Sequence, residues 1–116
     1  MVHRTFGGLD DAALLRFFLE HRESALYEAR RQAHLAWSVL CARQIERMRA
    51  YIVLFRRRHG HEDASPEFDD EVLRIAVERV LAAGAAFEGS TLREFRAMVR
   101  EGARRACAEA LAKGRR

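Results

Sequence analysis

The stretch from Ser24 to His59 contains neither glycine nor proline, and this constrains the fold more than any other feature of the chain. Hydrophobic residues recur along it at spacings of three and four, which is the period of an α-helix. They are Leu26, Ala29, Ala33, Trp37, Cys41, Ile45, Met48, Ile52 and Phe55. The pattern predicts either one long helix or two helices with a kink near Ala36 to Leu40. Gly60, which directly follows three arginines and a histidine, is expected to end the segment.

The rest of the chain also favours helices. Its 116 residues include one proline, and good helix formers (Ala, Leu, Arg and Glu) dominate. No run of alternating Val, Ile and Thr predicts a strand. Asp10 or Asp11 can cap a first helix from Ala12 to about Glu20, after a flexible lead-in at residues 1–8. The expected fold class is all-α: a compact bundle of four to five helices in a single domain, residues 1–116.

The pair Ser65-Pro66 marks the start of another helix. Serine is a favoured N-cap, and proline is favoured at the first helical position. We expect this helix to run from Pro66 to about Ala83, with Gly84 closing it. Acidic residues crowd its first turns, where the helix dipole favours negative charge. Val72, Ile75, Ala76, Val80 and Ala83 are expected to face inward, and Glu67, Asp70, Glu71, Arg74 and Glu78 to face outward.

The last third of the chain combines a short loop with a helix that carries two different stripes. The loop runs from Phe87 to Thr91, Ser90 or Thr91 is expected to cap the helix, and the helix is expected from Leu92 to about Lys113. One face is apolar (Leu92, Phe95, Val99, Gly102, Ala106 and Ala110), and its neighbour carries Arg93, Arg96, Arg100 and Arg104. Such a helix can pack on a protein core and offer cations to a polyanion at once.

Two phenylalanines beside this loop each have two interpretations. An aromatic ring can stack on an unpaired base, or it can fill the protein core. For Phe95 the position on the apolar stripe favours burial. For Phe87 both interpretations stay open.

The charges are distributed unevenly along the chain, although the net charge is only +4. Residues 62–88 hold eight acids and two arginines, whereas residues 93–116 hold eight bases and three acids. Residues 43–58 hold six arginines and one glutamate. Basic segments therefore flank an acidic one. Either the helices pair these charges within the fold, or separate faces bind a basic protein surface and a nucleic acid.

The sequence gives no indication of an enzyme. No nucleophile has a partner signature and no glycine-rich phosphate loop is present, so no cofactor is expected. The segment His59–Asp63 resembles a metal cluster, but no second ligand group accompanies it and no metal site is expected. Cys41 and Cys107 lie in apolar helical patterns and are expected to be buried and reduced. No apolar run approaches the ~20 residues of a membrane span and no signal region is evident, so a cytoplasmic protein without membrane contact is expected.

Four short segments occur in the same order as the sequence motifs of a known protein family. They are Leu9–Leu15, Gly60–Ala64, Glu67–Arg74 and Phe87–Phe95. In that order they resemble the opening helix, the loop before the acidic helix, the acidic helix and the Phe-x-Gly-x-Ser-Ser-Leu/Phe-Arg-x-Trp stretch of region 2 of the sigma-70 family. The form is that of extracytoplasmic-function sigma factors, and the arginine-rich end resembles their promoter-reading helix. The family's glutamine is Asp70 here, and the C-terminal region 4 is expected to be lacking.

The resemblance implies a protein of transcription initiation or its regulation. Asp69, Asp70, Glu71, Arg74 and Glu78 would dock on the clamp helices of the RNA polymerase core. The loop, through Phe87, Gly89, Ser90 and Thr91, would receive a base flipped out of the promoter −10 element. The arginines Arg93, Arg96, Arg100 and Arg104 would hold the phosphate backbone of the DNA. The resemblance also implies that an anti-sigma factor or another regulatory protein could bind this chain.

The alternative is a helical protein-interaction module that has lost DNA recognition, either a regulator or a self-associating bundle. The state of the arginine stripe discriminates between the two. Arginines free of carboxylate partners favour DNA binding, whereas arginines that pair with the acids between Glu67 and Glu78 favour the module.

Overall fold

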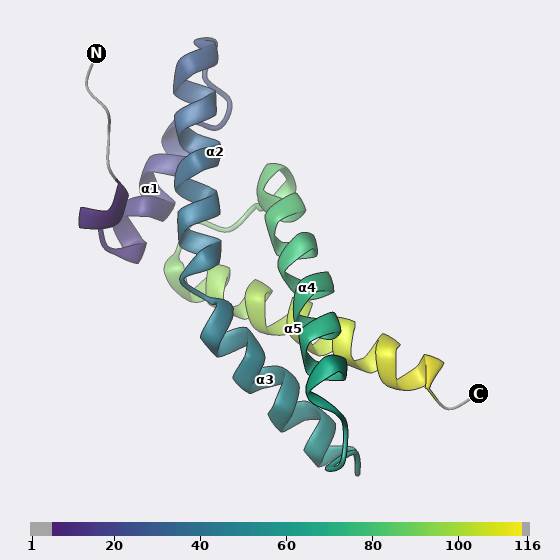
Figure 1. Cartoon of the computed structure of the whole chain (residues 1–116). Helices are drawn as coiled ribbons and strands as arrows, with labels where there is room; N and C mark the ends of the chain where they lie inside the picture. The colour runs from purple at the N-terminus through teal and green to yellow at the C-terminus, as the bar shows by residue number, and fades with distance from the viewer. Residues whose placement is uncertain (1–5, 115–116) are drawn as a thin grey trace.

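A computed structural model of the chain describes residues 6–114, and within these residues it contains helices and no strands (Figure 1). The five α-helices are α1 (Asp11–His21), α2 (Tyr27–Ala42), α3 (Ile45–Arg58), α4 (Pro66–Ala82) and α5 (Leu92–Lys113). Two short 3₁₀ helices, η1 (Phe6–Gly8) and η2 (Ala83–Ala86), accompany them. The predicted all-α bundle of four to five helices is confirmed.

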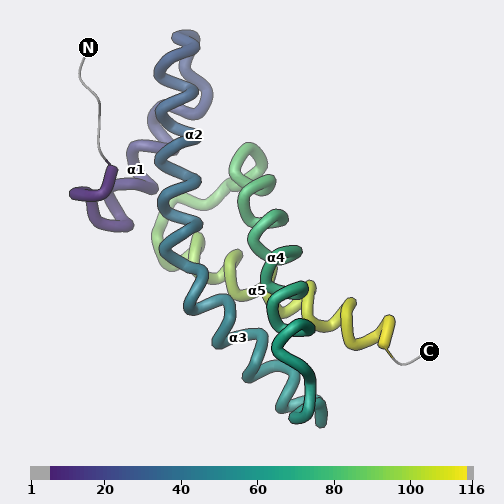
Figure 2. Tube along the Cα trace, in the orientation of Figure 1, coloured from purple at the N-terminus to yellow at the C-terminus, as the bar shows by residue number. Residues whose placement is uncertain are grey.

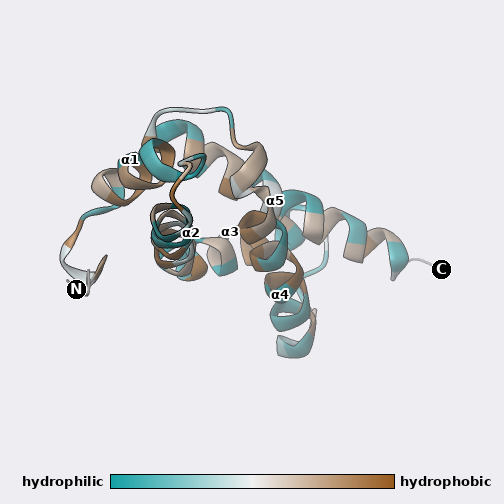
Figure 3. Ribbon diagram, turned by 90° about the horizontal axis from the view of Figure 1, so that it is seen from above, coloured by the Kyte–Doolittle hydropathy of each residue, from teal (hydrophilic) through white to brown (hydrophobic). Residues whose placement is uncertain are grey.

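The helices form an elongated bundle of 52 × 25 × 22 Å. In Figure 1, α1 lies against α2, α3 continues onward from α2, and α4 returns beside α3. The last helix, α5, crosses the bundle and packs on both α3 and α4. Hydrophobic and hydrophilic segments alternate along the helices in Figure 3, as expected where each helix turns one face to its neighbours.

The long segment without glycine or proline forms two helices, and the trace changes direction between them (Figure 2). The break lies at Arg43 and Gln44, which is later than the predicted kink near Ala36 to Leu40. At this point the backbone N–H of Gln44 donates to Cys41 instead of Leu40. The carbonyl of Leu40 accepts a hydrogen bond from the Gln44 side chain instead, at 3.2 Å. A buried side-chain amide therefore replaces one backbone bond, which the hydrophobic periodicity could not reveal.

The predicted helix ends with polar caps are confirmed. Asp10 accepts a hydrogen bond from the N–H of Ala13, and Ser65 accepts one from Phe68, so both residues cap their helices. Thr91, and not Ser90, caps α5. Gly60 lies just beyond α3 with φ of +80°, in the left-handed region that glycine adopts readily.

Three other expectations need correction. Helix α2 begins at Tyr27, because the chain turns at residues 22–23, bends at residues 25–26 and is extended at the N-cap residue Leu26. Residues 1–5 of the expected flexible lead-in lie outside the described residues, but Phe6 is buried and its ring packs on Phe17. Helix α4 ends at Ala82, which agrees with the predicted end near Ala83, but Gly84 lies within η2 instead of closing α4.

The core is centred on the indole ring of Trp37 in α2. The ring centroids of Phe18, Phe95 and Phe87 lie 4.5, 5.2 and 5.8 Å from that of Trp37. The indole N–H donates to the backbone carbonyls of Val80 and Leu81 at the end of α4, both at 3.2 Å. The same side chain therefore contacts α1, α4, α5 and the loop before α5.

The two cysteines behave as the sequence analysis expects. Cys41 and Cys107 are buried and form no disulfide. Burial raises the pKa of the Cys41 thiol to about 12, because the apolar surroundings disfavour the thiolate.

Replacing Gly84 with alanine tests the packing around Trp37. A Cβ atom at this position would lie 2.9 Å from Nε1 of Trp37, and the buried ring has little room to move. We expect Gly84→Ala to lower the free energy of unfolding by about 1–3 kcal/mol, as measured by urea denaturation. Gly8→Ala is the matched control, because a Cβ atom there meets nothing within 4 Å. Equal stability of the two variants would contradict the account.

Candidate nucleic-acid interface

A capping box fixes the start of α5. The hydroxyl oxygen of Thr91 accepts a hydrogen bond from the N–H of Glu94 at 3.2 Å. The carboxylate of Glu94 in turn accepts bonds from the Thr91 hydroxyl at 2.9 Å and from the N–H of Ser90 at 3.3 Å. These bonds, with that from the Thr91 side chain the strongest, lower the pKa of Glu94. The loop and the first turn of α5 are thereby joined, which sets the direction of the arginine row that follows.

The four arginines of α5 are exposed, but they differ in their partners. Within the described residues, Arg93 has no hydrogen-bond or ion-pair partner, and the Arg100 guanidinium lies 5.9 Å from the ring centroid of Tyr51. Arg96 lies 3.6 Å from a carboxylate oxygen of Asp11. Arg104 pairs within its own helix with Glu101, and this bond lowers the pKa of Glu101 to about 2. We therefore restrict the candidate row to Arg93, Arg96 and Arg100.

The acids of α4 do not neutralise this row. Among the described residues, Asp70 pairs with Arg49 of α3 at 2.9 Å, and Glu71 and Glu78 both pair with Arg74. The arginine row and the acidic helix therefore have separate partners. Within residues 6–114, no arginine of the row pairs with an acid of α4, which is the pairing that would favour the interaction module.

The expectation that Asp69 faces a partner protein is wrong. Only 7% of Asp69 is exposed, and its two carboxylate oxygens accept bonds from Nε and Nη2 of Arg56 at 2.7 and 2.9 Å. Arg56 also donates to the carbonyls of His61 and Glu62, so the pair ties α3, the following loop and α4 together. The spacing of Asp69 from Val72 and Ala76, three and seven residues, is a sequence signal for this inward position.

The loop residues fall into two groups. Phe87 is only 7% exposed, so the core interpretation of this ring is the correct one and stacking on a base is not supported. Gly89 lies against it, because a Cβ atom at Gly89 would come within 2.5 Å of the Phe87 ring. Arg22 of α1 holds the loop by donating to the carbonyl of Phe87. Ser90 and Thr91, by contrast, are exposed.

An open hollow lies beside the exposed half of the loop. Ser90, Thr91 and Leu92 form one side, and Leu15, Arg16 and Leu19 are among the residues of α1 that form the other. Its walls are both apolar and polar, and Arg16 supplies a cation at its edge. No local sequence pattern indicates a role for Arg16, since only the packing of α1 beside the loop brings it there.

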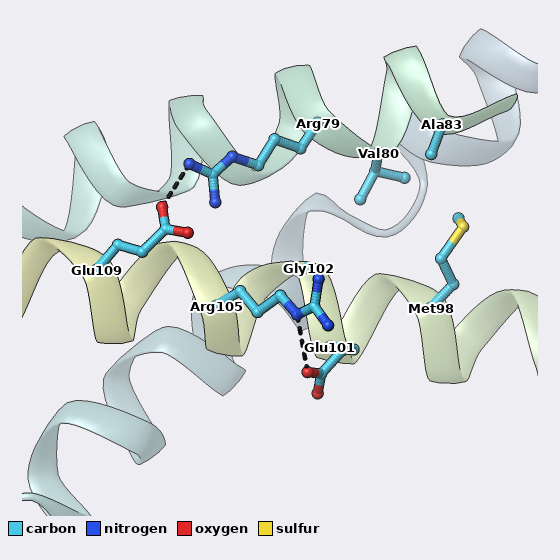
Figure 4. Close-up of a pocket in the computed structure, with 8 residues that line it drawn as sticks. All are labelled: Arg79, Val80, Ala83, Met98, Glu101, Gly102, Arg105 and Glu109. Atoms are coloured by element: carbon cyan, nitrogen blue, oxygen red, sulfur yellow. Dashed lines mark hydrogen bonds and ion pairs between the residues drawn. The ribbon is translucent and has the colours of Figure 1, made fainter. Parts of the chain in front are cut away.

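A second groove lies between α4 and α5, where Figure 4 shows side chains from both helices. Arg79 crosses it to Glu109, and Arg105 bonds to Glu101 on the same helix. Val80 and Met98 supply apolar walls. Because both arginines already hold carboxylates, this groove offers less free positive charge than the row of Arg93, Arg96 and Arg100.

Comparison of the chain with protein-family models, with curated proteins and with solved structures gives no significant match. The resemblance to sigma region 2 therefore stays a prediction. No helix within residues 6–114 is long and apolar enough to cross a membrane. The same residues contain no group of three or more His, Cys, Asp or Glu side chains that could hold a metal ion.

Asp69 and Asp70 form a matched pair for measuring the buried ion pair. Asp69→Ala leaves Arg56 buried without its carboxylate, and we expect the free energy of unfolding to fall by about 3–5 kcal/mol. Asp70→Ala removes an exposed pair and is expected to cost about 0–1 kcal/mol. Chemical denaturation followed by circular dichroism gives both values. Similar losses in the two variants would mean that Asp69 has no special structural role.

Proposed function

We propose that this protein takes part in transcription initiation or its regulation, binding single-stranded promoter DNA along α5 and RNA polymerase core through α4. The observation that carries the proposal is the exposed row of Arg93, Arg96 and Arg100, which, in the part of the chain that the structure describes, pairs with no carboxylate of α4. Arginine binds phosphate oxygens through several N–H donors, and phosphate contacts supply most of the sequence-independent affinity for nucleic acids.

Base recognition is proposed for the hollow between α1 and the loop. Ser90 and Thr91 offer polar groups there, and the partly exposed Leu19 and Leu92 offer apolar surface. Taking a base out of the stack costs a few kcal/mol of stacking free energy. Contacts of the base with the hollow, and of the phosphates with the arginine row, would have to offset this cost. This assignment replaces the one expected for Phe87 and Gly89, whose packing belongs to the core.

The polymerase contact is proposed for the exposed residues of α4, namely Asp70, Glu71, Arg74 and Glu78. Their ion pairs are all solvent-exposed, and exposed pairs contribute only about 0–1 kcal/mol each. A basic surface of a partner can therefore replace Arg74 or Arg49 as counter-ion at little cost. Asp69 is not part of this surface.

The helical protein-interaction module remains a second candidate, and one observation favours it. Leu26 and Tyr27, at the start of α2, are 72% and 71% exposed, and Leu35 two turns later is also exposed. Exposed large hydrophobic side chains that share one region of the surface are typical of protein contacts.

The salt dependence of DNA binding tests the proposed function. If Arg93, Arg96 and Arg100 each contact one phosphate, log–log plots of affinity against salt should have a slope of about −2, at ~0.7 per contact on a single strand. We expect Arg100→Ala to flatten the slope by up to about 0.7 and to weaken binding of every sequence alike. The assay is fluorescence anisotropy of a labelled −10 non-template strand.

Arg57→Ala serves as the matched control for this experiment. Arg57 is an exposed arginine near the end of α3, outside the row, so its loss changes the net charge equally. If the control weakens binding as much as Arg100→Ala, the row is not the DNA site. If the protein shows no salt-sensitive binding at all, the interaction module replaces the proposed function.

A further inference from the structure

Three parts of the chain meet at the carboxylate of Asp11, the first residue of α1. One oxygen lies 3.1 Å from Nη1 of Arg43, at the junction of α2 and α3. The other accepts a bond from Nε2 of Gln44 at 3.3 Å and lies 3.6 Å from Nη2 of Arg96 on α5. The Asp11 side chain is 20% exposed, so solvent reaches this junction.

Arginines outnumber acids around this carboxylate. Arg47 donates to the side-chain oxygen of Gln44 at 3.4 Å, and the side-chain nitrogen of Gln44 in turn donates to Asp11. Arg100 follows Arg96 by about one helical turn and lies over Tyr51 of α3. Two arginines from separate segments, Arg43 and Arg96, thus contact one carboxylate, and Arg47 and Arg100 add positive charge one turn further along the same two segments. The row on α5 is only one side of this cluster.

The arginines differ in how firmly they are held. Arg43 donates to the backbone carbonyls of Phe6, Gly7 and Leu9 as well as to Asp11, so its position does not depend on the carboxylate. Arg96 has Asp11 as its ion-pair partner among the described residues, at the longer distance of 3.6 Å, and its side chain is 43% exposed. A long pair whose arginine is exposed to solvent is weak, so another anion can replace the carboxylate beside Arg96.

We propose that Arg43, Arg47, Arg96 and Arg100 form a phosphate-binding site in which Asp11 is an internal counter-ion, displaced from Arg96 by a phosphate of single-stranded nucleic acid. The inference rests on the proposed function, because it specifies the ligand and the regulation of the same face of α5. A phosphodiester presents two unesterified oxygens with one negative charge, as a carboxylate does, so it can take the place of Asp11 beside a guanidinium.

Removing the negative charge of Asp11 is therefore expected to strengthen the binding of nucleic acid. In the free protein Asp11 competes with the ligand for Arg96. Without this competition Arg96 is available to the nucleic acid from the start, while Arg43 stays bound to the carbonyls of residues 6–9. A residue that only supported the fold would, when replaced, weaken binding or leave it unchanged.

The experiment compares Asp11→Asn with Asp10→Asn in the full chain. Each variant removes one negative charge from neighbouring positions, but Asp10 contacts no arginine among residues 6–114. It caps α1, a role that asparagine fills equally well. The probe is a fluorescent oligothymidylate, and the measurement is anisotropy over a range of salt concentrations. We expect Asp11→Asn to bind about two- to fivefold more tightly, the factor that corresponds to losing one weak competing pair. Asp10→Asn should stay close to the wild-type affinity.

A double variant assigns the gain to Arg96. Asp11→Asn should bring no gain when it is added to Arg96→Gln, because no arginine is then released. Circular dichroism verifies that each variant is folded, and Asp11→Ser serves as the neutral substitute if Asp11→Asn does not fold. An equal gain from Asp10→Asn, or a gain that persists beside Arg96→Gln, would overturn the inference.

The remaining outcomes separate this inference from the proposed function. If the wild type does not bind DNA but Asp11→Asn does, the internal counter-ion is supported and wild-type DNA binding is not. If neither binds, both proposals are wrong. If the wild type binds and Asp11→Asn binds no better, only the inference is overturned. If Asp11→Asn raises the affinity for an oligoglutamate peptide of equal charge more than it raises the affinity for DNA, nucleic acid is not the ligand of this site.

Discussion

The packing of aromatic rings around Trp37 is the interaction on which the rest of the structure depends. The indole contacts Phe18 from α1 and Phe95 from α5, and its N–H reaches the carbonyls at the end of α4. Removing such a side chain from a core generally costs several kcal/mol. Here it would also release contacts that relate four of the five α-helices to one another.

The two charged surfaces are positioned by this core. Phe87 packs on Trp37, Gly89 allows the loop to pass over Phe87, and Thr91 then starts α5 with its capping box. The arginine row follows on the outer side of α5. At the other end of the molecule, the buried pair of Arg56 and Asp69 fixes α4 against α3, which leaves the remaining acids of α4 exposed.

Much of the fold could be predicted from the sequence, because its signals are local. The caps at Asp10, Ser65 and Thr91 and the left-handed turn at Gly60 depend only on residues a few positions away. The apolar stripe of α5 was predicted for the same reason, and Phe95 is buried as expected.

The features that the sequence did not reveal depend on tertiary contacts. The break at Gln44 requires both the Leu40 carbonyl and Asp11, which is 33 residues away. The burial of Phe87 follows from its contact with Trp37, which no local pattern indicates. The proximity of Arg43 to Arg96 likewise follows only from the packing that brings both side chains to Asp11.

The central claim is that α4 and α5 carry separate sites, one for polymerase and one for DNA. Retention of RNA polymerase core by the immobilised protein tests it most directly. The decisive variant combines Asp70→Lys, Glu71→Lys and Glu78→Lys on the exposed face of α4. Its control, with equal net charge, combines Glu23→Lys, Glu28→Lys and Glu46→Lys.

The account predicts that the wild type and the control retain core polymerase and that the α4 variant does not. The α4 variant should still bind single-stranded DNA, since the arginine row has no partner on α4 among the described residues. Failure of the wild type to retain polymerase, or equal retention by the α4 variant, would contradict the account.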